Sequence, residues 1–190
     1  MVLEVGLGGR LDAVNAFDAD CAVVTSIGMD HMDYLGATLE AIGREKAGIF
    51  RAGKPAVIAD AGAPVSVLAH AHSIGARLLR SGQEFGYDRG QGWWTYWGPA
   101  GEEAELPYPA LFGDIQLQNA SAALAALDSL CDRLPVSIRD LRQGLAGVEL
   151  PGRFQRLPGC PTLVLDVGHN PQAAMVLARK RAGSTPTAIA

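Results

Sequence analysis

The sequence has few of the features that mark several protein classes. Only three of its 190 residues are cysteine (Cys21, Cys131 and Cys160), and no two of them form a Cys-x-x-Cys motif. An odd number at this spacing is typical of buried thiols in a reducing compartment. No apolar run reaches the roughly 18 residues of a membrane span, and the N-terminus has no signal-peptide layout. The sequence therefore predicts a cytoplasmic protein with no membrane partner.

The sequence also has fewer basic than acidic residues. Sixteen Lys and Arg residues face twenty Asp and Glu residues, and the net charge of −4 argues against nucleic acid as the main partner. Hydrophobic residues make up 48% and charged residues 19%, which excludes a disordered tail and a charged coiled coil. The 23 glycines exceed the roughly 7% average, and many follow apolar runs, as in tight strand-to-helix turns. A length of 190 residues fits one domain, or one domain and a piece of another.

Short apolar runs alternate with helical patterns along the chain. This predicts an α/β fold with a mostly parallel sheet flanked by helices. The predicted strands are 1–10, 21–27, 55–59 and 162–167, with a weaker one at 76–79. The first runs into a glycine turn, and we expect it to be buried. The predicted helices are 39–50, 64–75, 114–133 (ended by Pro135), one that starts at a capping box on Ser137, and 172–181 after Asn170 and Pro171.

Residues 81–108 differ from this pattern because they are rich in glycine and aromatics. They predict a short β excursion, most simply a surface hairpin that packs its own aromatic side chains; the alternative is an aromatic wall of a substrate site. Residues 150–153 look like a hinge. We therefore expect residues 1–150 to form one domain, a partial central domain, and residues 151–190 to begin a second α/β domain.

Three predicted strands end in polar groups, where open α/β sheets gather their ligands. Glu4 lies inside an apolar strand, where a carboxylate is costly unless it is paired or bound to metal. His31 follows the next strand between Asp30 and Asp33, and could share a divalent ion with Glu4. The alternative is a helix cap formed by Asp30 or Asp33 beside a hydrogen-bonded histidine.

Lys46 is placed by helical spacing on the apolar face of its helix. Burial lowers the proton affinity of a lysine, and a neutral amine can capture carbon dioxide as a carbamate, an oxygen ligand that suits Mg²⁺. The alternative is a lysine whose ammonium group reaches solvent along that face.

The third polar strand end leads into a helix. His169, Asn170 and Pro171 would cap its N-terminus, whose amides attract an anion such as phosphate, and Arg153 could add a second cationic contact. The alternative is simple helix capping.

Six segments together resemble the folylpolyglutamate synthase/dihydrofolate synthase family of the wider Mur ligase group. They are Glu-Val-Gly-Leu-Gly-Gly-Arg-Leu-Asp-Ala (4–13), Thr-Ser-Ile-Gly-Met-Asp-His (25–31), Ile-Gly-Arg-Glu-Lys-Ala-Gly-Ile (42–49), Gln-Leu-Gln-Asn-Ala (116–120), Pro-Gly-Arg-Phe-Gln (151–155) and Asp-Val-Gly-His-Asn-Pro (166–171). The resemblance implies an ATP-dependent ligase that phosphorylates the carboxylate of dihydropteroate or a folate and then joins L-glutamate to it as an amide.

The resemblance also implies roles for individual residues. They are metal binding by Glu4, His31 and Lys46, catalysis by a carbamylated Lys46 and by His169, substrate binding by Leu11, Asp12 and Ala13, and nucleotide binding by Asn119, Arg153 and Asp166. It implies ATP and two Mg²⁺ ions as cofactors, the second ion held by the carbamylated lysine, and a monomer at full length with small-molecule partners only.

One family motif is missing, since no Gly-x-x-x-x-Gly-Lys-Ser/Thr phosphate loop occurs in the sequence. In this family the loop precedes the strand that holds Glu4. We therefore expect the chain to be an internal fragment that is inactive alone. The alternatives are a non-catalytic fragment that binds nucleotide, folate or a complementing chain, and a metal-dependent hydrolase built on Asp30, His31 and Asp33.

Overall fold

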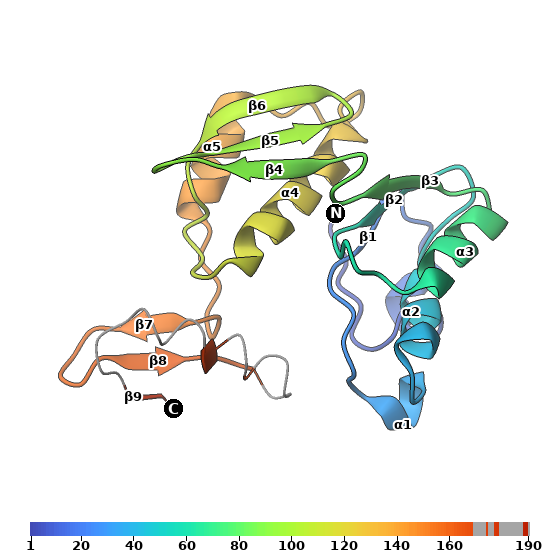
Figure 1. The fold of residues 1–190 in the computed structure, drawn as a ribbon, viewed down its shortest axis with the longest axis horizontal. Helices are drawn as coiled ribbons and strands as arrows, with labels where there is room; N and C mark the ends of the chain where they lie inside the picture. Colours follow the sequence, from blue (N-terminus) through green and yellow to red (C-terminus); the bar gives the residue numbers. More distant parts are fainter. Residues whose placement is uncertain (169–173, 175–176, 179–187, 190) are drawn as a thin grey trace.

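The structure is a computed structural model that describes residues 1–168, 174, 177–178 and 188–189. Most of the predicted helix 172–181, and the cap formed by His169, Asn170 and Pro171, lie outside the described residues. In the described part, the strands form three separate three-stranded sheets (Figure 1). The fold is therefore α/β, as the sequence predicts, but it has more than one sheet.

The elements alternate along the chain much as the sequence pattern indicates. The strands are β1 (Ala22–Val24), β2 (Pro55–Ile58), β3 (Arg77–Arg80), β4 (Gly86–Arg89), β5 (Trp94–Gly98), β6 (Gly101–Leu106), β7 (Gln155–Leu157), β8 (Leu163–Leu165) and β9 (Ala188–Ile189). The helices are the short 3-10 helix η1 (Ala13–Ala16) and α1 (Met32–Leu35), α2 (Leu39–Ala47), α3 (Val65–Ser73), α4 (Ile115–Asp128) and α5 (Ile138–Gly147). None of the described helices combines the length and apolar content of a membrane span.

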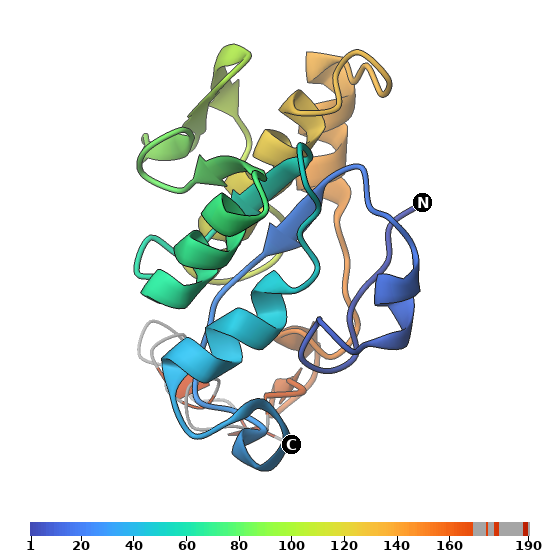
Figure 2. The same cartoon turned by 90° about the vertical axis from the view of Figure 1, so that its right-hand side faces the viewer.

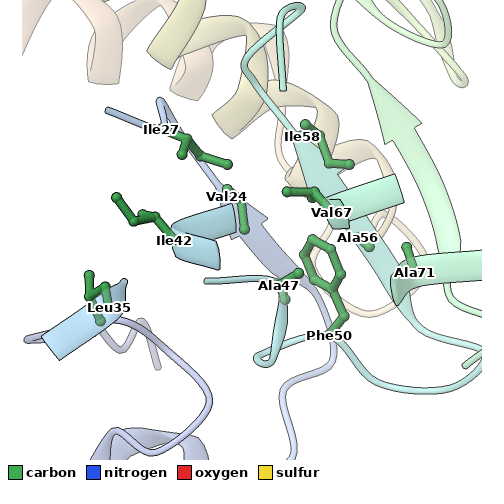
Figure 3. Packing of buried hydrophobic residues seen from close by; sticks show 11 residues of the cluster. Val24, Ile27, Leu35, Ile42, Ala47, Phe50, Ala56, Ile58, Val67 and Ala71 are labelled. Carbon is green, nitrogen blue, oxygen red and sulfur yellow. The ribbon is translucent and has the colours of Figure 1, made fainter. Parts of the chain in front are cut away.

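The first sheet is parallel, in the order β1-β2-β3, with Ala22 opposite Ala56 and Pro55 opposite Arg77. β2 is buried along its whole length, as expected for the central strand of a covered parallel sheet. Helices α2 and α3 pack on one face of this sheet (Figure 2), and their buried side chains meet those of the strands in one hydrophobic cluster (Figure 3). The predicted strands 21–27 and 55–59 are confirmed in shortened form, and the one at 76–79 is confirmed with a shift of one residue.

Local signals explain where α2 and α3 begin. The Thr38 hydroxyl accepts a hydrogen bond from the Ala41 amide at 3.1 Å and caps α2. The Glu40 carboxylate accepts from the amides of Val65 and Ser66, at 3.2 and 2.7 Å, and so satisfies the free N–H groups of α3. A Cβ at Gly43 would lie 2.9 Å from a Val67 methyl carbon, so glycine allows the two helices to approach closely.

The second sheet is antiparallel, in the order β4-β5-β6. Trp94 and Tyr96 on β5 are fully buried and pack with Leu117, Leu124 and other side chains of α4 in a second hydrophobic cluster. The expected surface hairpin is therefore wrong. The aromatic segment forms a sheet whose alternating bulky residues face α4, and these side chains form one side of the second hydrophobic cluster.

The predicted C-terminal end of α4 needs correction. The helix ends at Asp128, not near Arg133, because the following amides bond three residues back, as in Leu130 to Leu127 and Cys131 to Asp128. Leu134, beyond the end of the helix, is 53% exposed. The capping box of α5 is confirmed, with the Ser137 and Asp140 side chains each bonded to the other's backbone amide.

Residues 1–5 do not form the predicted buried strand. They have no regular secondary structure, and Met1 and Val2 are almost fully exposed. A strand needs a neighbour for its backbone groups, but β1, the edge of the parallel sheet, pairs with β2 alone. The apolar sequence is strand-like, but none of the described strands pairs with it.

The third sheet lies near the C-terminus. β8, within the predicted strand 162–167, pairs antiparallel with β7 and parallel with β9. β7 was not predicted, because its three residues, two polar and one apolar, are too few to give a pattern. Figure 1 shows this sheet set apart from the other two, below the loop that leads into α4.

Candidate functional site

Two side chains tie together the elements at the carboxyl ends of β1 and β2. Asp60, just after β2, accepts hydrogen bonds from the amides of Ile27 (3.3 Å) and Gly62 (2.9 Å). Gln118 on α4 donates its side-chain amide to the carbonyl of Ala59 at 2.7 Å. The segment after β1, the end of β2 and the first turns of α4 therefore meet at the edge where parallel sheets bind ligands.

Asn119, a predicted nucleotide contact, follows Gln118 on α4. Its side chain is exposed and donates to the Gln116 side-chain oxygen at 3.3 Å. Because Gln118 holds α4 against β2, Asn119 has a fixed place beside this edge of the sheet.

Asp12 organises the glycine-rich loop of residues 6–12. One of its carboxylate oxygens accepts from the amides of Gly6 and Leu7, both at 3.0 Å, and the other accepts from Val14 at 3.0 Å. The backbone hydrogen bonds from Leu7, Val14 and Gly6 lower the pKa of the Asp12 carboxyl, because they stabilise its charged form. The same carboxylate caps η1, so this residue of the predicted substrate loop serves first as a structural anchor.

The glycine-rich loop packs on the C-terminal end of α2. The Arg10 amide donates to the Glu45 carbonyl at 2.9 Å, and its guanidinium pairs with the Glu45 carboxylate at 3.0 Å. A Cβ at Gly9 would lie 2.8 and 2.9 Å from the carbonyl oxygens of Glu45 and Lys46, so only glycine fits there. Leu11 and Ala13 are exposed beside Asp12. The structure thus brings the predicted substrate residues next to the helix turn that carries Lys46.

The Lys46 side chain itself is half-buried, not enclosed. The buried face of α2 consists of Ile42, Gly43 and Ala47, and Leu39, on the predicted apolar line, is 44% exposed. Full burial of the lysine is therefore wrong: helix α2 is rotated so that Lys46 lies at the border of its apolar face. No hydrogen bond or ion pair of its ammonium group is found among the described residues.

His31 begins α1 in a left-handed conformation (φ 48°). Its amide donates to the Asp30 carboxylate at 2.8 Å, and its ring nitrogen Nε2 lies 3.8 Å from the same oxygen. The alternative of a helix cap from Asp30 or Asp33 is wrong, since His31 is the N-cap residue of α1 and its side chain makes no capping hydrogen bond. Asp33 lies in the first turn of the helix.

The predicted metal ligands do not come together as a finished site. Glu4 is exposed on the irregular N-terminal segment. In the described part of the chain, no three His, Cys, Asp or Glu side chains are grouped so that they could hold a metal ion. Glu4 and His31 are therefore not part of an assembled three-residue group of this kind in the described residues.

Arg153 and Asp166 lie close together through the backbone between them. Asp166 accepts from the amide of Phe154 at 2.9 Å and from that of Gly168 at 2.8 Å, and so joins the end of β8 to the start of β7. Arg153 directly precedes Phe154 and its side chain is exposed. His169 lies outside the described residues.

Asp60 and Gln118 were missed in the sequence, although a usable signal for Asp60 exists. It directly follows the apolar run 55–59, the same arrangement that singled out Asp166. Gln118 carries no such signal, because its role depends on the packing of α4 against β2.

The comparisons with known proteins agree with this geometry. Residues 1–127 match the Mur ligase middle domain family. The chain belongs to the Mur ligase family. It is 46% identical over 177 residues to the dihydrofolate synthase/folylpolyglutamate synthase of Escherichia coli (strain K12), covering 93% of this chain and 40% of that protein. The enzyme of the same name from Mycobacterium tuberculosis is 37% identical over 194 residues, covering 94% and 40%.

Solved structures of this Mur ligase group share the fold. E. coli FolC in complex with DHPP and ADP superimposes with a TM-score of 0.86 at 45% identity, over 96% of this chain and 43% of that one. A bifunctional folylpolyglutamate synthase/dihydrofolate synthase with Mn, AMPPNP and L-glutamate bound gives 0.83 at 45% identity, over 94% and 42%. The chain thus spans less than half the length of these relatives.

Proposed function

We propose that this chain is part of an ATP-dependent ligase that adds L-glutamate to dihydropteroate or to a folate. The observation that carries the proposal is the 46% identity over 93% of the chain to an enzyme named for both activities. The relatives whose structures hold DHPP and ADP, or AMPPNP and L-glutamate, support the three substrate classes. We also propose a cytoplasmic protein that is a monomer at full length.

The reaction has two steps. A carboxylate oxygen of the pterin substrate attacks the γ-phosphorus of ATP, ADP leaves, and an acyl phosphate forms. The glutamate amine then attacks the acyl carbon, phosphate leaves, the amine loses a proton, and an amide results. The acyl phosphate must be kept from water, which favours a site closed between two domains.

The proposed residue roles are those that the family resemblance implies. Leu11, Asp12 and Ala13 contact the pterin substrate from the loop that Asp12 holds in place. Asn119, Arg153 and Asp166 contact the nucleotide, the first from α4 and the other two from the C-terminal segment. His169 acts near the glutamate or the phosphate groups, and Lys46 acts from the end of α2.

Divalent metal use is proposed from the relative that binds Mn with AMPPNP. Glu4, His31 and a carbamylated Lys46 are the proposed ligands of two Mg²⁺ ions. Such ions would neutralise charge on the transferred phosphoryl group. Because Glu4 lies on an unpaired segment in this fold, we expect this chain alone to bind Mn²⁺ no better than its Glu4→Gln variant does, as measured by isothermal titration calorimetry.

Residues 1–150 are proposed to form the partial central domain and residues 151–190 the start of the C-terminal domain. The two hydrophobic clusters support this division, since all of their residues precede Leu150. A non-catalytic fragment is the second candidate, favoured by the exposed, unpaired N-terminal segment.

Incorporation of labelled glutamate into dihydropteroate tests the proposal. The assay uses a chain extended to the length of its relatives, with and without ATP. We expect an ATP-dependent glutamyl product, and Arg153→Ala should slow its formation much more than Arg142→Ala, a change in an exposed arginine of α5. A product formed without ATP, or no product at all, would contradict the ligase.

A further inference from the structure

The C-terminal segment of residues 151–168 is joined to the rest of the molecule by an aromatic contact. Neither hydrophobic cluster of the described chain includes a residue beyond Leu145. Phe112, in the loop between β6 and α4, stacks on Phe154 at the start of β7, with ring centroids 4.8 Å apart and planes at 14°. Figure 1 shows that loop reaching down from β6 toward the third sheet. We call this pair the ring latch.

The ring latch has the features of a contact that holds an orientation. Phe154 is 6% exposed although it belongs to neither cluster, while Phe112 keeps 43% of its surface exposed. The guanidinium carbon of Arg156 lies 5.9 Å from the Phe112 centroid, within the range of a cation–π contact. Stacked, flat rings fix both the distance and the angle between the segments that carry them.

On its C-terminal side, the latch is coupled to two proposed nucleotide contacts. Phe154 has a left-handed backbone (φ 50°), which is rare for a bulky residue and needs support from its surroundings. Its amide donates to Asp166, and Arg153 is its direct neighbour in the chain. The backbone that carries the Phe154 ring therefore also carries Arg153 and the amide that Asp166 accepts from.

On its other side, the latch rests on an anchored loop. The Tyr108 hydroxyl donates to the Gly90 carbonyl at 2.9 Å, and Asp114 pairs with Arg89 of β4 at 2.9 Å. These contacts hold the loop at both sides of Phe112, and α4 with Asn119 begins directly after it.

We propose that the ring latch is a positioning device that sets Arg153 and Asp166 relative to Asn119. This inference rests on the proposed function in one respect, the assignment of these three residues as nucleotide contacts. Phe112 and Phe154 are positioning residues, since they act through the backbone that they hold.

Residual dipolar couplings of this chain test the latch without any nucleotide. In the unsubstituted chain, couplings from residues 155–165 and from β1 to β6 should fit one alignment tensor. In Phe112→Ala the couplings of 155–165 should no longer fit the tensor of the other strands and should shrink at least about twofold, as expected for a segment that reorients on its own. The amide of Phe154 should also exchange about tenfold faster or more.

Two variants serve as controls. Phe112→Tyr keeps the stacked ring, and the partly exposed side chain leaves room for a hydroxyl. The couplings of all the strands should therefore fit one alignment tensor in this variant. Phe17→Ala removes an exposed ring elsewhere and should leave all couplings unchanged. One common tensor in Phe112→Ala would overturn the proposal, and so would loss of the couplings of β1 to β6, which would make Phe112 a core residue. A failed ligase assay would leave these couplings as they are, so the two failures are distinguishable.

Discussion

At the scale of single residues, one carboxylate shapes the loop next to the proposed substrate site. Asp12 accepts three backbone hydrogen bonds and holds residues 6–14 in a fixed turn. A charged acceptor forms stronger hydrogen bonds than a neutral one, so the loop depends on the ionised form. Its proposed substrate role therefore depends on its structural one.

Removing the Asp12 carboxylate should loosen the loop. In Asp12→Ala we expect the amides of Gly6, Leu7 and Val14 to exchange faster with deuterium, while strands β1 to β3 keep their protection. Asp33→Ala, a matched change at an exposed aspartate, should change none of these rates. Unchanged exchange at Gly6 and Leu7 in Asp12→Ala would contradict the account.

The same carboxylate predicts a pH dependence. The folded pKa of Asp12 lies below the ordinary value of 3.8, so its contribution is fully present above that pH and is lost as the pH falls through the lowered value. Amide chemical shifts of Gly6 and Leu7, followed by NMR on acidification, should therefore titrate below pH 3.8. A midpoint above that value would show that the amides do not stabilise the charge.

At the scale of elements, Tyr96 links the antiparallel sheet to the end of α4. Its hydroxyl is buried and donates to the Asp128 carboxylate at 2.7 Å. Burial and, after it, the hydrogen bond to Asp128 raise the pKa of the Tyr96 phenol. A raised acid pKa contributes stability below the ordinary value of 10.0, and this is lost as the pH rises above it, because the unfolded tyrosine ionises first.

Tyr96→Phe should therefore lower the free energy of unfolding by about 1–2 kcal/mol, because the Asp128 carboxylate loses a donor. Urea denaturation at neutral pH measures this, and repeating it above pH 10 should shrink the difference between the two proteins. Tyr34→Phe, at a residue that is 78% exposed, is the control and should have no effect. Equal stability of Tyr96→Phe and the unsubstituted chain would argue against this link.

Alanine substitutions at two glycines in different surroundings test the packing of the glycine-rich loop on α2. Gly9→Ala would push a methyl group into the α2 carbonyls of Glu45 and Lys46, and should destabilise the chain by about 1–3 kcal/mol. Gly144→Ala in α5 meets no atom within 4 Å and should stabilise it by about 0.5–1 kcal/mol through helix propensity. Thermal unfolding should move the two variants in opposite directions, and a Gly9→Ala variant as stable as the unsubstituted chain would contradict the packing of the loop on α2.

At the scale of the whole molecule, what the sequence predicts and what it misses have physical reasons. Capping signals and apolar runs are local, so the capping box of α5 and the strand at 55–59 are predicted correctly. Pairing is not local, and residues 1–5 look like a strand but have no neighbour to pair with. The candidate site divides in the same way: the motif residues are visible in the sequence, whereas Gln118 and the half-buried state of Lys46 follow from how the helices pack.

The proposed division at residue 150 predicts that the central part folds independently. A chain ended at residue 150 keeps every residue of both hydrophobic clusters, so it should unfold cooperatively, with a melting temperature within a few degrees of that of the full chain. Circular dichroism during heating measures this. A noncooperative transition or a molten state would show that residues 151–190 complete the core.

The most direct test of the proposed ligase is phosphate release from ATP in the presence of Mg²⁺, glutamate and dihydropteroate or tetrahydrofolate. It should be measured on this chain and on a chain extended upstream to the length of its relatives. We predict release that requires all the substrates in the extended chain and none in the chain of 190 residues. No release from either chain would contradict a ligase and favour a non-catalytic module.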